Sequence, residues 1–381
     1  MSHSIIKPIK VLQLICPTGY YGAERWIVTL AKSLDATAIQ CDLAVTVEPN
    51  MEELKIVGEY RATGQTVHEV KMNNRFDLGV ILRLKNLIRE KGYTLIHTHG
   101  YKSDILGLIA GRLAGVTTIS TPHGFENAED WKLRAYIALG NKTLKHFDVV
   151  APLSEELCAD VRALGVKENA LCYIKNGVDL EEASDQIASA SSNLRLREKK
   201  KKRVGFIGQM ISRKNIFDLL DIFNSLSAEN PELELILLGD GDERAELERY
   251  AHTLAATSQI QFLGFRDDRI EWLQSFDLFV MTSTLEGIPR CLMESMAMGI
   301  PVAAYKIAGI DQLLFHNETG LLAELGDKAA LEDCWKTLLY DTAVADRIAS
   351  SARDYVMKEF SGNRMADDYT RLYRKLSADI T

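Results

Sequence analysis

The sequence has no long apolar run. No stretch approaches the ~18–20 apolar residues that a membrane-spanning helix needs, and residues 1–10 carry charges but no apolar segment typical of a signal peptide. We therefore expect a cytoplasmic protein with neither a signal peptide nor a membrane span.

Clustered cysteines and an excess of basic residues are also absent. The chain has six cysteines in 381 residues, none of them in a Cys-x-x-Cys pair, which argues against a structural zinc site and a thioredoxin-like redox site. Scattered cysteines suit a reducing compartment. The net charge of -8 argues against general binding of nucleic acid, whose phosphates require the opposite balance.

Short apolar runs alternate with amphipathic helical patterns along the whole chain. Such runs predict strands that are covered on both faces, and their alternation with helices predicts parallel sheets of an α/β fold. The predicted strands are Val11–Cys16, Leu95–His97, Val149–Leu153, Val204–Ile207, Leu233–Leu238, Leu278–Met281 and Val302–Tyr305.

The chain is long enough for two domains, and its composition changes near residues 183–203. We predict an N-terminal Rossmann-like domain (1–185), a basic linker (186–203), a C-terminal Rossmann-like domain (204–360) and a helix (361–381) that packs back on the N-terminal domain. The basic segment Arg195–Arg203 fits two interpretations equally, a solvated linker or a peripheral contact with the inner face of a membrane.

Two carboxylates, Glu286 and Glu294, follow the predicted strand Leu278–Met281. Pro289 suits the first turn of a helix, which places Glu286 on the loop at the carboxyl end of the strand and Glu294 near the start of the helix. Such a helix start favours a phosphate, and a carboxylate there can accept bonds from sugar hydroxyls. Carboxylates also occur at helix starts simply because they suit the helix dipole.

The run from Ser283 to Val302 closely resembles the Glu-x7-Glu signature of the retaining GT-B glycosyltransferases of family 4 (glycosyl transferases group 1). Further matching segments occur in the expected order over nearly the whole chain. They are Gly22–Glu24, His97–Gly100, Thr121–Gly124, Asn176–Asp179, Lys214, Gly239–Gly241, Gly264–Phe265 and Gly309. The resemblance implies two Rossmann-like, doubly wound domains that face each other across a cleft. The C-terminal domain would bind the nucleotide and the N-terminal domain most of the acceptor.

The resemblance also implies roles for individual residues. Glu294 would hold the ribose, and Glu286 with the backbone of Gly287 and Ile288 would hold the donor sugar. Lys214 would neutralise the diphosphate, Gly22 would let the backbone approach it, and His123 would lie beside the transferred sugar. Nucleotide choice would depend on contacts around Gly264 and Phe265. Family members of this type generally need no metal, so we expect neither a metal nor another cofactor.

The chain departs from the family pattern at three places. Gln209 stands where an arginine is usual, so one of two expected diphosphate cations is missing, and we expect Arg213 to substitute for it. Tyr21 replaces the first glycine of the N-terminal pair. The later Gly-Gly-x-x-Glu pattern is changed in residues 308–312.

Three other patterns have a structural interpretation. His97 and His99 have the spacing of a metal pair on a strand, but no third ligand is evident, which favours a strand-end or acceptor-side placement. Asp240 and Asp242 resemble an Asp-x-Asp metal motif but more simply form a turn and a helix N-cap. Ser154 precedes two glutamates and fits a helix cap.

The function expected from the sequence is transfer of a hexose-type sugar from a UDP- or GDP-sugar. The acceptor would be a glycan, a lipid-linked or a small molecule, in the biosynthesis of a cell-surface polysaccharide or lipopolysaccharide. One alternative is a nicotinamide-dependent oxidoreductase or epimerase, although the turn Gly19–Gly22 lacks the Gly-x-Gly-x-x-Gly pattern. Another is a non-catalytic relative that acts as a binding subunit.

Overall fold

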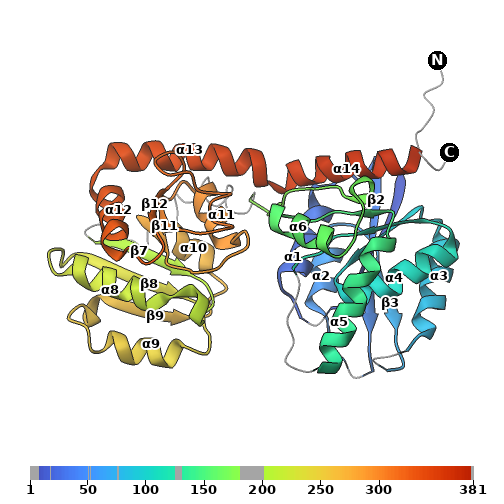
Figure 1. Ribbon diagram of the computed structural model, residues 1–381, viewed down its shortest axis with the longest axis horizontal. Coiled ribbons are helices and arrows are strands. Elements are labelled where there is room, and N and C mark those ends of the chain that lie inside the picture. Colours follow the sequence, from blue (N-terminus) through green and yellow to red (C-terminus); the bar gives the residue numbers. More distant parts are fainter. Residues whose placement is uncertain are drawn as a thin grey trace, which may run out of the picture. The chain divides into compact units, whose positions relative to one another are not determined.

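The computed structural model describes residues 8–17, 19–49, 51, 53–74, 77–124, 131–180 and 201–378 (Figure 1). The chain forms two compact units. Unit 1 comprises Met1–Gly177 and Gly362–Thr381, and unit 2 comprises Val178–Ser361.

Unit 1 contains a six-stranded parallel sheet of order β3-β2-β1-β4-β5-β6. Its strands are β1 (Ile9–Ile15), β2 (Ile39–Val47), β3 (Val67–Lys71), β4 (Leu95–His99), β5 (Thr117–Ser120) and β6 (Val149–Val150). Its α-helices are α1 (Gly22–Ser33), α2 (Lys55–Arg61), α3 (Gly79–Lys91), α4 (Tyr101–Ala114), α5 (Trp131–Thr143), α6 (Glu155–Ala163) and α14 (Gly362–Ala378), and η1 (Leu144–His146) and η2 (Glu168–Ala170) are short 3-10 turns.

Helices cover both faces of this sheet because alternate residues of each strand point to opposite faces. Val11 and Ile15 belong to the apolar cluster that includes residues of α1, α2 and α14. Leu12 and Leu14 belong to a second cluster, with residues of α3 and α4. The helix α14 therefore contributes to the core of unit 1 although it follows unit 2 in the sequence.

Unit 2 repeats the same topology, with a parallel sheet of order β12-β11-β10-β7-β8-β9. Its strands are β7 (Lys202–Ile207), β8 (Leu233–Leu238), β9 (Ile260–Gly264), β10 (Leu278–Met281), β11 (Val302–Lys306) and β12 (Leu321–Glu324). Its α-helices are α8 (Ile216–Ser227), α9 (Arg244–Ala251), α10 (Arg269–Gln274), α11 (Arg290–Ala297), α12 (Lys328–Tyr340) and α13 (Thr342–Phe360), with the 3-10 turns η4 (Ser212–Lys214) and η5 (Thr257–Gln259).

The predicted fold class is confirmed, because each unit is a doubly wound parallel sheet with helices on both faces. Each of the seven predicted strands overlaps an observed one, and β8 and β10 have the predicted bounds.

The predicted basic linker lies mostly outside the described residues, up to residue 200. Its last part was assigned wrongly, because β7 begins at Lys202 and not at Val204. Lys201 and Arg203 form ion pairs with Glu234 of β8, at 2.7 and 3.1 Å. Opposite charges on neighbouring strands therefore hold these basic residues in the fold.

Candidate active site

The strand order of unit 2 changes direction between β7 and β10. These strands are neighbours, but the chain continues from β7 to β8 on one side and from β10 to β11 on the other. The loops that follow the carboxyl ends of β7 and β10 therefore run in opposite directions. Ligands of doubly wound sheets bind in the crevice at such a point. The loops in question are residues 208–215 and 282–289.

Hydrogen bonds between the two loops fix their relative position. The Thr284 N–H donates to the carbonyl oxygen of Arg213 at 2.8 Å, and the Thr282 hydroxyl donates to that of Lys214 at 3.1 Å. Asn215 follows η4 with φ of 47°, a left-handed conformation that asparagine tolerates better than most residues. This turn ends η4 and begins α8, and it places Arg213 and Lys214 against the second loop.

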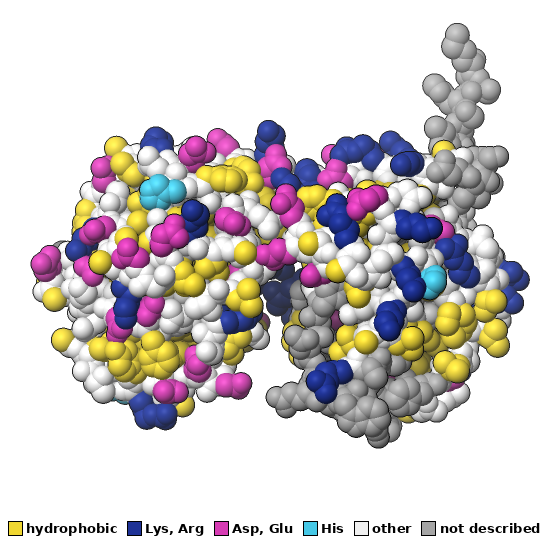
Figure 2. Space-filling model, in the orientation of Figure 1, with side chains coloured by type: hydrophobic (Ala, Val, Ile, Leu, Met, Phe, Trp, Pro, Cys, Tyr) yellow, Lys and Arg dark blue, Asp and Glu magenta, His cyan; other side chains and the backbone are white. Residues whose placement is uncertain are grey.

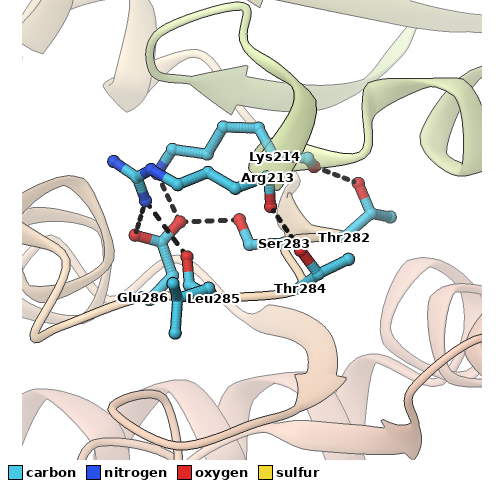
Figure 3. Close-up of polar contacts among 7 residues, drawn as sticks. All are labelled: Arg213, Lys214, Thr282, Ser283, Thr284, Leu285 and Glu286. Carbon is cyan, nitrogen blue, oxygen red and sulfur yellow. Dashed lines mark hydrogen bonds and ion pairs between the residues drawn. The ribbon is translucent and has the colours of Figure 1, made fainter. Parts of the chain in front are cut away.

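Glu286 lies at the centre of a buried charged cluster (Figure 3). Its Oε1 accepts from Lys214 Nζ and, at 2.6 Å, from the Ser283 hydroxyl, and its Oε2 accepts from Arg213 Nη1 at 3.0 Å. The side chain of Glu286 is 5% exposed and that of Lys214 8%, whereas Arg213 is 40% exposed. Two cations face one carboxylate, so the cluster carries a net positive charge in surroundings that screen charge weakly.

Glu294 is held by a second pair of cations. Its Oε1 accepts from Arg290 Nε at 2.7 Å and from Arg269 Nη2 at 2.9 Å. Glu294 is the fifth residue of α11, which begins at Arg290, so it lies about one turn into the helix, as predicted. Pro289 is the N-cap and not part of the first turn, since its ψ of 123° is extended.

Glycine packing shapes the loops around the cluster. Gly309 has φ of 86°, and a Cβ there would lie 2.0 Å from the carbonyl oxygen of Gly287. A Cβ on Gly239 would lie 1.9 Å from that of Gly208. Only glycine allows these backbones to approach so closely.

The other predicted donor-binding residues of unit 2 lie near loop tips. Gln209 is exposed in the loop after β7. Gly264 ends β9 with φ of 68°, and Phe265 beside it is 72% exposed, which is unusual for a large apolar side chain.

The predicted residues of unit 1 form a different kind of cluster. His97 and His99 lie near the end of strand β4, as predicted. The Nδ1 atom of His99 is 3.1 Å from the Nε2 atom of His123. His97 lies 2.8 Å from both the Tyr373 hydroxyl of α14 and the Thr121 hydroxyl. Burial lowers the pKa of His97 and of His123 to about 3, and that of His99 well below its usual value. All three rings are therefore neutral near pH 7.

Gln13 determines which ring nitrogen of His123 carries the proton. Its amide nitrogen donates to the Tyr373 hydroxyl at 3.1 Å, so its amide oxygen accepts from His99 Nε2 at 2.5 Å. A neutral imidazole has one N–H, hence His99 Nδ1 is an acceptor and His123 Nε2 is the donor. His123 Nδ1 consequently carries a lone pair, and it can accept a hydrogen bond but cannot donate one.

Gly22, the remaining predicted residue, begins α1 directly after Tyr21. It is exposed, and a Cβ there would meet nothing within 4 Å. Glu24 caps the start of this helix, because its Oε2 accepts a hydrogen bond from the Tyr21 N–H at 3.0 Å.

Two predicted caps have different outcomes. Ser154 caps α6, as expected, and accepts from the Leu157 N–H at 3.2 Å. The cap expected at Asp240 and Asp242 was wrong, because Glu243 is the N-cap of α9. Asp240 instead forms an ion pair with Arg244 at 3.0 Å. Within the described part of the chain, no group of three or more His, Cys, Asp or Glu residues is arranged to hold a metal ion.

Several residues of these clusters were missed from the sequence. Arg290 could have been found, because it lies four residues before Glu294, the spacing of a helical ion pair. Arg269 and Gln13 could not, since only the folded chain brings them to their partners.

Family models match both halves of the chain. The model described as "Glycosyltransferase Family 4" matches residues 20–182, and the one described as "Glycosyl transferases group 1" matches residues 190–355. The chain belongs to the GT-B glycosyltransferases of family 4. It is therefore a nucleotide-sugar-dependent transferase.

Individual glycosyltransferases resemble it over most of their length. The UDP-Gal:alpha-D-GlcNAc-diphosphoundecaprenol alpha-1,3-galactosyltransferase of Escherichia coli is 26% identical, over 78% of this chain and 79% of that protein. The N-acetyl-alpha-D-glucosaminyl L-malate synthase of Bacillus anthracis is 23% identical, over 82% and 84%. These matches do not favour the oxidoreductase or the binding subunit.

Solved structures share the fold. HepE of Anabaena, in complex with UDP, superposes with a TM-score of 0.79 at 21% identity, over 97% of this chain and all of that one. Sucrose-phosphate synthase of Thermosynechococcus elongatus superposes with a TM-score of 0.74 at 20% identity.

Proposed function

We propose that this glycosyltransferase transfers a hexose-type sugar from a UDP-sugar, with retention of configuration, to a glycan or lipid-linked acceptor in the biosynthesis of a cell-surface polysaccharide. The charged cluster of Lys214, Arg213 and Glu286 carries the proposal. Support for the uridine nucleotide comes from the galactosyltransferase of E. coli, which is named for UDP-Gal, and from HepE, which was solved with UDP and with UDP-glucose.

The cluster suits departure of a nucleoside diphosphate. Cleavage of the sugar–phosphate bond leaves additional negative charge on phosphate oxygens, and cations already positioned there stabilise the transition state. Lys214 is buried and fixed by Glu286, so little reorganisation is needed as the charge develops. Arg213 contacts the same carboxylate. It supplies the second positive charge, which is missing at position 209 because Gln209 stands where an arginine is usual. Because these cations offset the leaving charge, the proposed reaction needs no metal.

The two carboxylates have separate roles in this proposal. Glu286 and the backbone of Gly287 and Ile288 hold the donor sugar. Both arginine bonds to Glu294 end on Oε1, and we assign Oε2 to the ribose hydroxyls. Charge-assisted hydrogen bonds of this kind contribute about 1.5–3 kcal/mol. The backbone around Gly264 and Phe265 contacts the base.

His123 positions the sugar and does not act as a general base. A base works best with a pKa near the working pH, whereas the pKa of His123 is about 3. Its Nδ1 lone pair accepts a hydrogen bond from a sugar hydroxyl. Gly22, with open space at its Cα, admits the diphosphate to the start of α1.

The place of action proposed is the cytoplasm, with peripheral attachment to the inner face of a membrane where a lipid-linked acceptor would be found. Within the described residues, no helix is long and apolar enough to cross a bilayer.

A ligand screen followed by product analysis tests the proposal. UDP should raise the unfolding temperature more than GDP, ADP or NAD, because a ligand that binds the folded state stabilises it. A panel of UDP-sugars is then incubated with acceptors, with and without EDTA, and NMR determines the anomeric configuration of the product. Absence of UDP binding and of sugar transfer would reject the proposal. An inverted product would reject retention alone.

A further inference from the structure

We infer that the solvent-facing side of helices α3, α4 and α5 is the surface through which the protein binds an anionic phospholipid bilayer. We call this surface the α3–α5 face. It consists of five exposed apolar side chains and the basic residues around them. The apolar residues are Leu78, Leu82, Ile109, Leu113 and Leu139.

The three helices form one layer against the same side of the sheet in unit 1. Each follows a different strand, and α4 contacts both α3 and α5. Arg89 of α3 donates to the carbonyl oxygen of Leu113 at 2.8 Å, and a Cβ on Gly140 of α5 would lie 2.5 Å from that of Tyr101. In Figure 2, hydrophobic side chains gather over these helices, with Lys and Arg around them.

The apolar residues of the α3–α5 face do not belong to the core. They are between 41% and 71% exposed, although inward residues of the same helices, such as Leu84 and Leu106, are fully or almost fully buried. Leu78, Leu82, Lys85 and Arg89 follow one another at spacings of four, three and four residues, so they form one stripe along α3. An exposed apolar patch beside basic residues suits a membrane surface, because the apolar side chains can enter the headgroup boundary while the cations attract anionic lipids.

The charge of these helices is opposite to that of the chain. Together α3, α4 and α5 contain nine Lys or Arg residues and two acids, in a protein with a net charge of -8. One of the acids, Asp104, is buried, which leaves Glu90 at the surface. Arg83, Lys102 and Arg112 pair with acids outside the three helices. The other cations whose side chains are described outnumber Glu90 and complement anionic headgroups.

This inference rests on the peripheral attachment proposed above and names the surface that makes it, and the binding itself needs no nucleotide sugar. The membrane contact expected at Arg195–Arg203 stays a separate prediction, since residues 195–200 lie outside the described residues. Of the described part, Lys201 and Arg203 pair with Glu234, and Lys202 donates to the carbonyl oxygen of Leu339.

Vesicle flotation without nucleotide sugar tests the inference. The full chain should float with vesicles of equal parts phosphatidylglycerol and phosphatidylcholine, should not float with phosphatidylcholine alone, and should bind more weakly at high salt. The double variant Leu82→Ser/Leu113→Ser and the double variant Lys85→Gln/Lys142→Gln should each lower the partition coefficient at least tenfold.

Matched variants in unit 2 are the controls. Leu325 is 50% exposed, and Lys336 and Lys358 are exposed lysines. The variants Leu325→Ser and Lys336→Gln/Lys358→Gln should float like the wild type. Equal flotation of all variants, or equal binding to both kinds of vesicle, overturns the inference. Light scattering tests the alternative that a second copy of the chain covers this face. A dimer that becomes monomeric in the Leu82→Ser/Leu113→Ser variant would support that alternative and overturn the inference. If the wild-type chain floats with the anionic vesicles but transfers no sugar, the proposed sugar transfer is refuted and the inference about the α3–α5 face is not.

Discussion

Units 1 and 2 have the same strand order but different chemistry at the carboxyl ends of their sheets. In unit 1 the polar side chains around His97 and His99 are neutral, namely those of histidine, tyrosine, glutamine and threonine residues. In unit 2 charged side chains form ion pairs around Glu286 and Glu294. The same topology therefore accommodates a neutral site and a charged one.

The difference follows from where the side chains originate. His97 and His99 lie on a strand between two layers of helices, where a charged imidazole would be poorly solvated. Lys214 and Glu286 come from loops beyond the strand ends, where each charge has a partner. We propose that unit 2 binds the anionic part of the donor and unit 1 binds uncharged sugar hydroxyls. The following four predictions test this contrast, in order of decreasing free energy.

Mild acid should destabilise unit 1 selectively. His97 and His123 have a pKa of about 3 when folded and near 6.5 when unfolded, so the unfolded chain binds more protons and stability falls as pH falls through this range. Asp104 acts in the opposite direction, because burial raises its pKa to about 7. His99 adds to the histidine effect. Unit 1 should therefore lose at least about 1.4 kcal/mol per pH unit between about pH 6 and about pH 4.

Brief proteolysis in urea, with fragments identified by mass spectrometry, measures each unit separately. Unit 2 serves as the internal control, since both of its histidines, His252 and His316, are exposed, and its midpoint should change by less than half as much. The variant His97→Gln should reduce the slope for unit 1. Equal slopes for both units would contradict the prediction.

Replacement of Lys214 should impair the reaction most. The Lys214→Ala variant removes the buried cation, and kcat should fall about a hundredfold, which corresponds to about 2.7 kcal/mol. Initial rates at saturating UDP-sugar measure the effect. Lys328→Ala, which removes an exposed lysine paired with Asp221, is the control. Turnover of Lys214→Ala at the wild-type rate would show that Lys214 does not stabilise the leaving group.

Loss of charge at Glu294 should weaken donor binding. The Glu294→Gln variant should raise the Kd for UDP about tenfold, or about 1.4 kcal/mol, because the charge-assisted bonds to ribose are lost. Calorimetric titration with UDP and with uracil separates ribose recognition from base recognition. An equal loss of affinity for both ligands would contradict the ribose assignment.

The smallest effect is expected at Gln13. A Gln13→Met variant keeps a similar shape but cannot accept from His99, so the proton positions on His99 and His123 are no longer fixed. We expect a change in the ¹⁵N shifts of His123 that marks a mixed tautomer, and a decrease in kcat of about threefold, or about 0.7 kcal/mol. Unchanged shifts would refute the assigned proton positions. Gln13→Glu, which keeps an acceptor for His99, should preserve the shifts of His123 better.

The sequence predicted the strands that are mostly apolar. β10 is entirely apolar and β8 has one polar residue, Glu234, and both were found with the correct bounds. β2 was missed because polar residues interrupt it; one of them, Asp42, is buried and accepts from the Tyr93 hydroxyl at 2.7 Å. Glu286 and Glu294 of the candidate site could be predicted from the sequence, because they form the Glu-x7-Glu signature. The cations that hold Glu294 and the amide that orders the histidines depend on tertiary contacts, which no local pattern encodes.

The position of α14 has a consequence for synthesis of the protein. The core of unit 1 includes Tyr369 and Tyr373, but residues 178 to 361, all 184 residues of unit 2, are translated first. At about 5–20 residues per second, this interval lasts on the order of ten to forty seconds. During that time the nascent N-terminal sheet exposes the apolar surface that α14 will cover, and Gln13 and His97 lack their tyrosine partner. The growing chain therefore exposes an apolar surface of the kind that chaperones bind until α14 has left the ribosome.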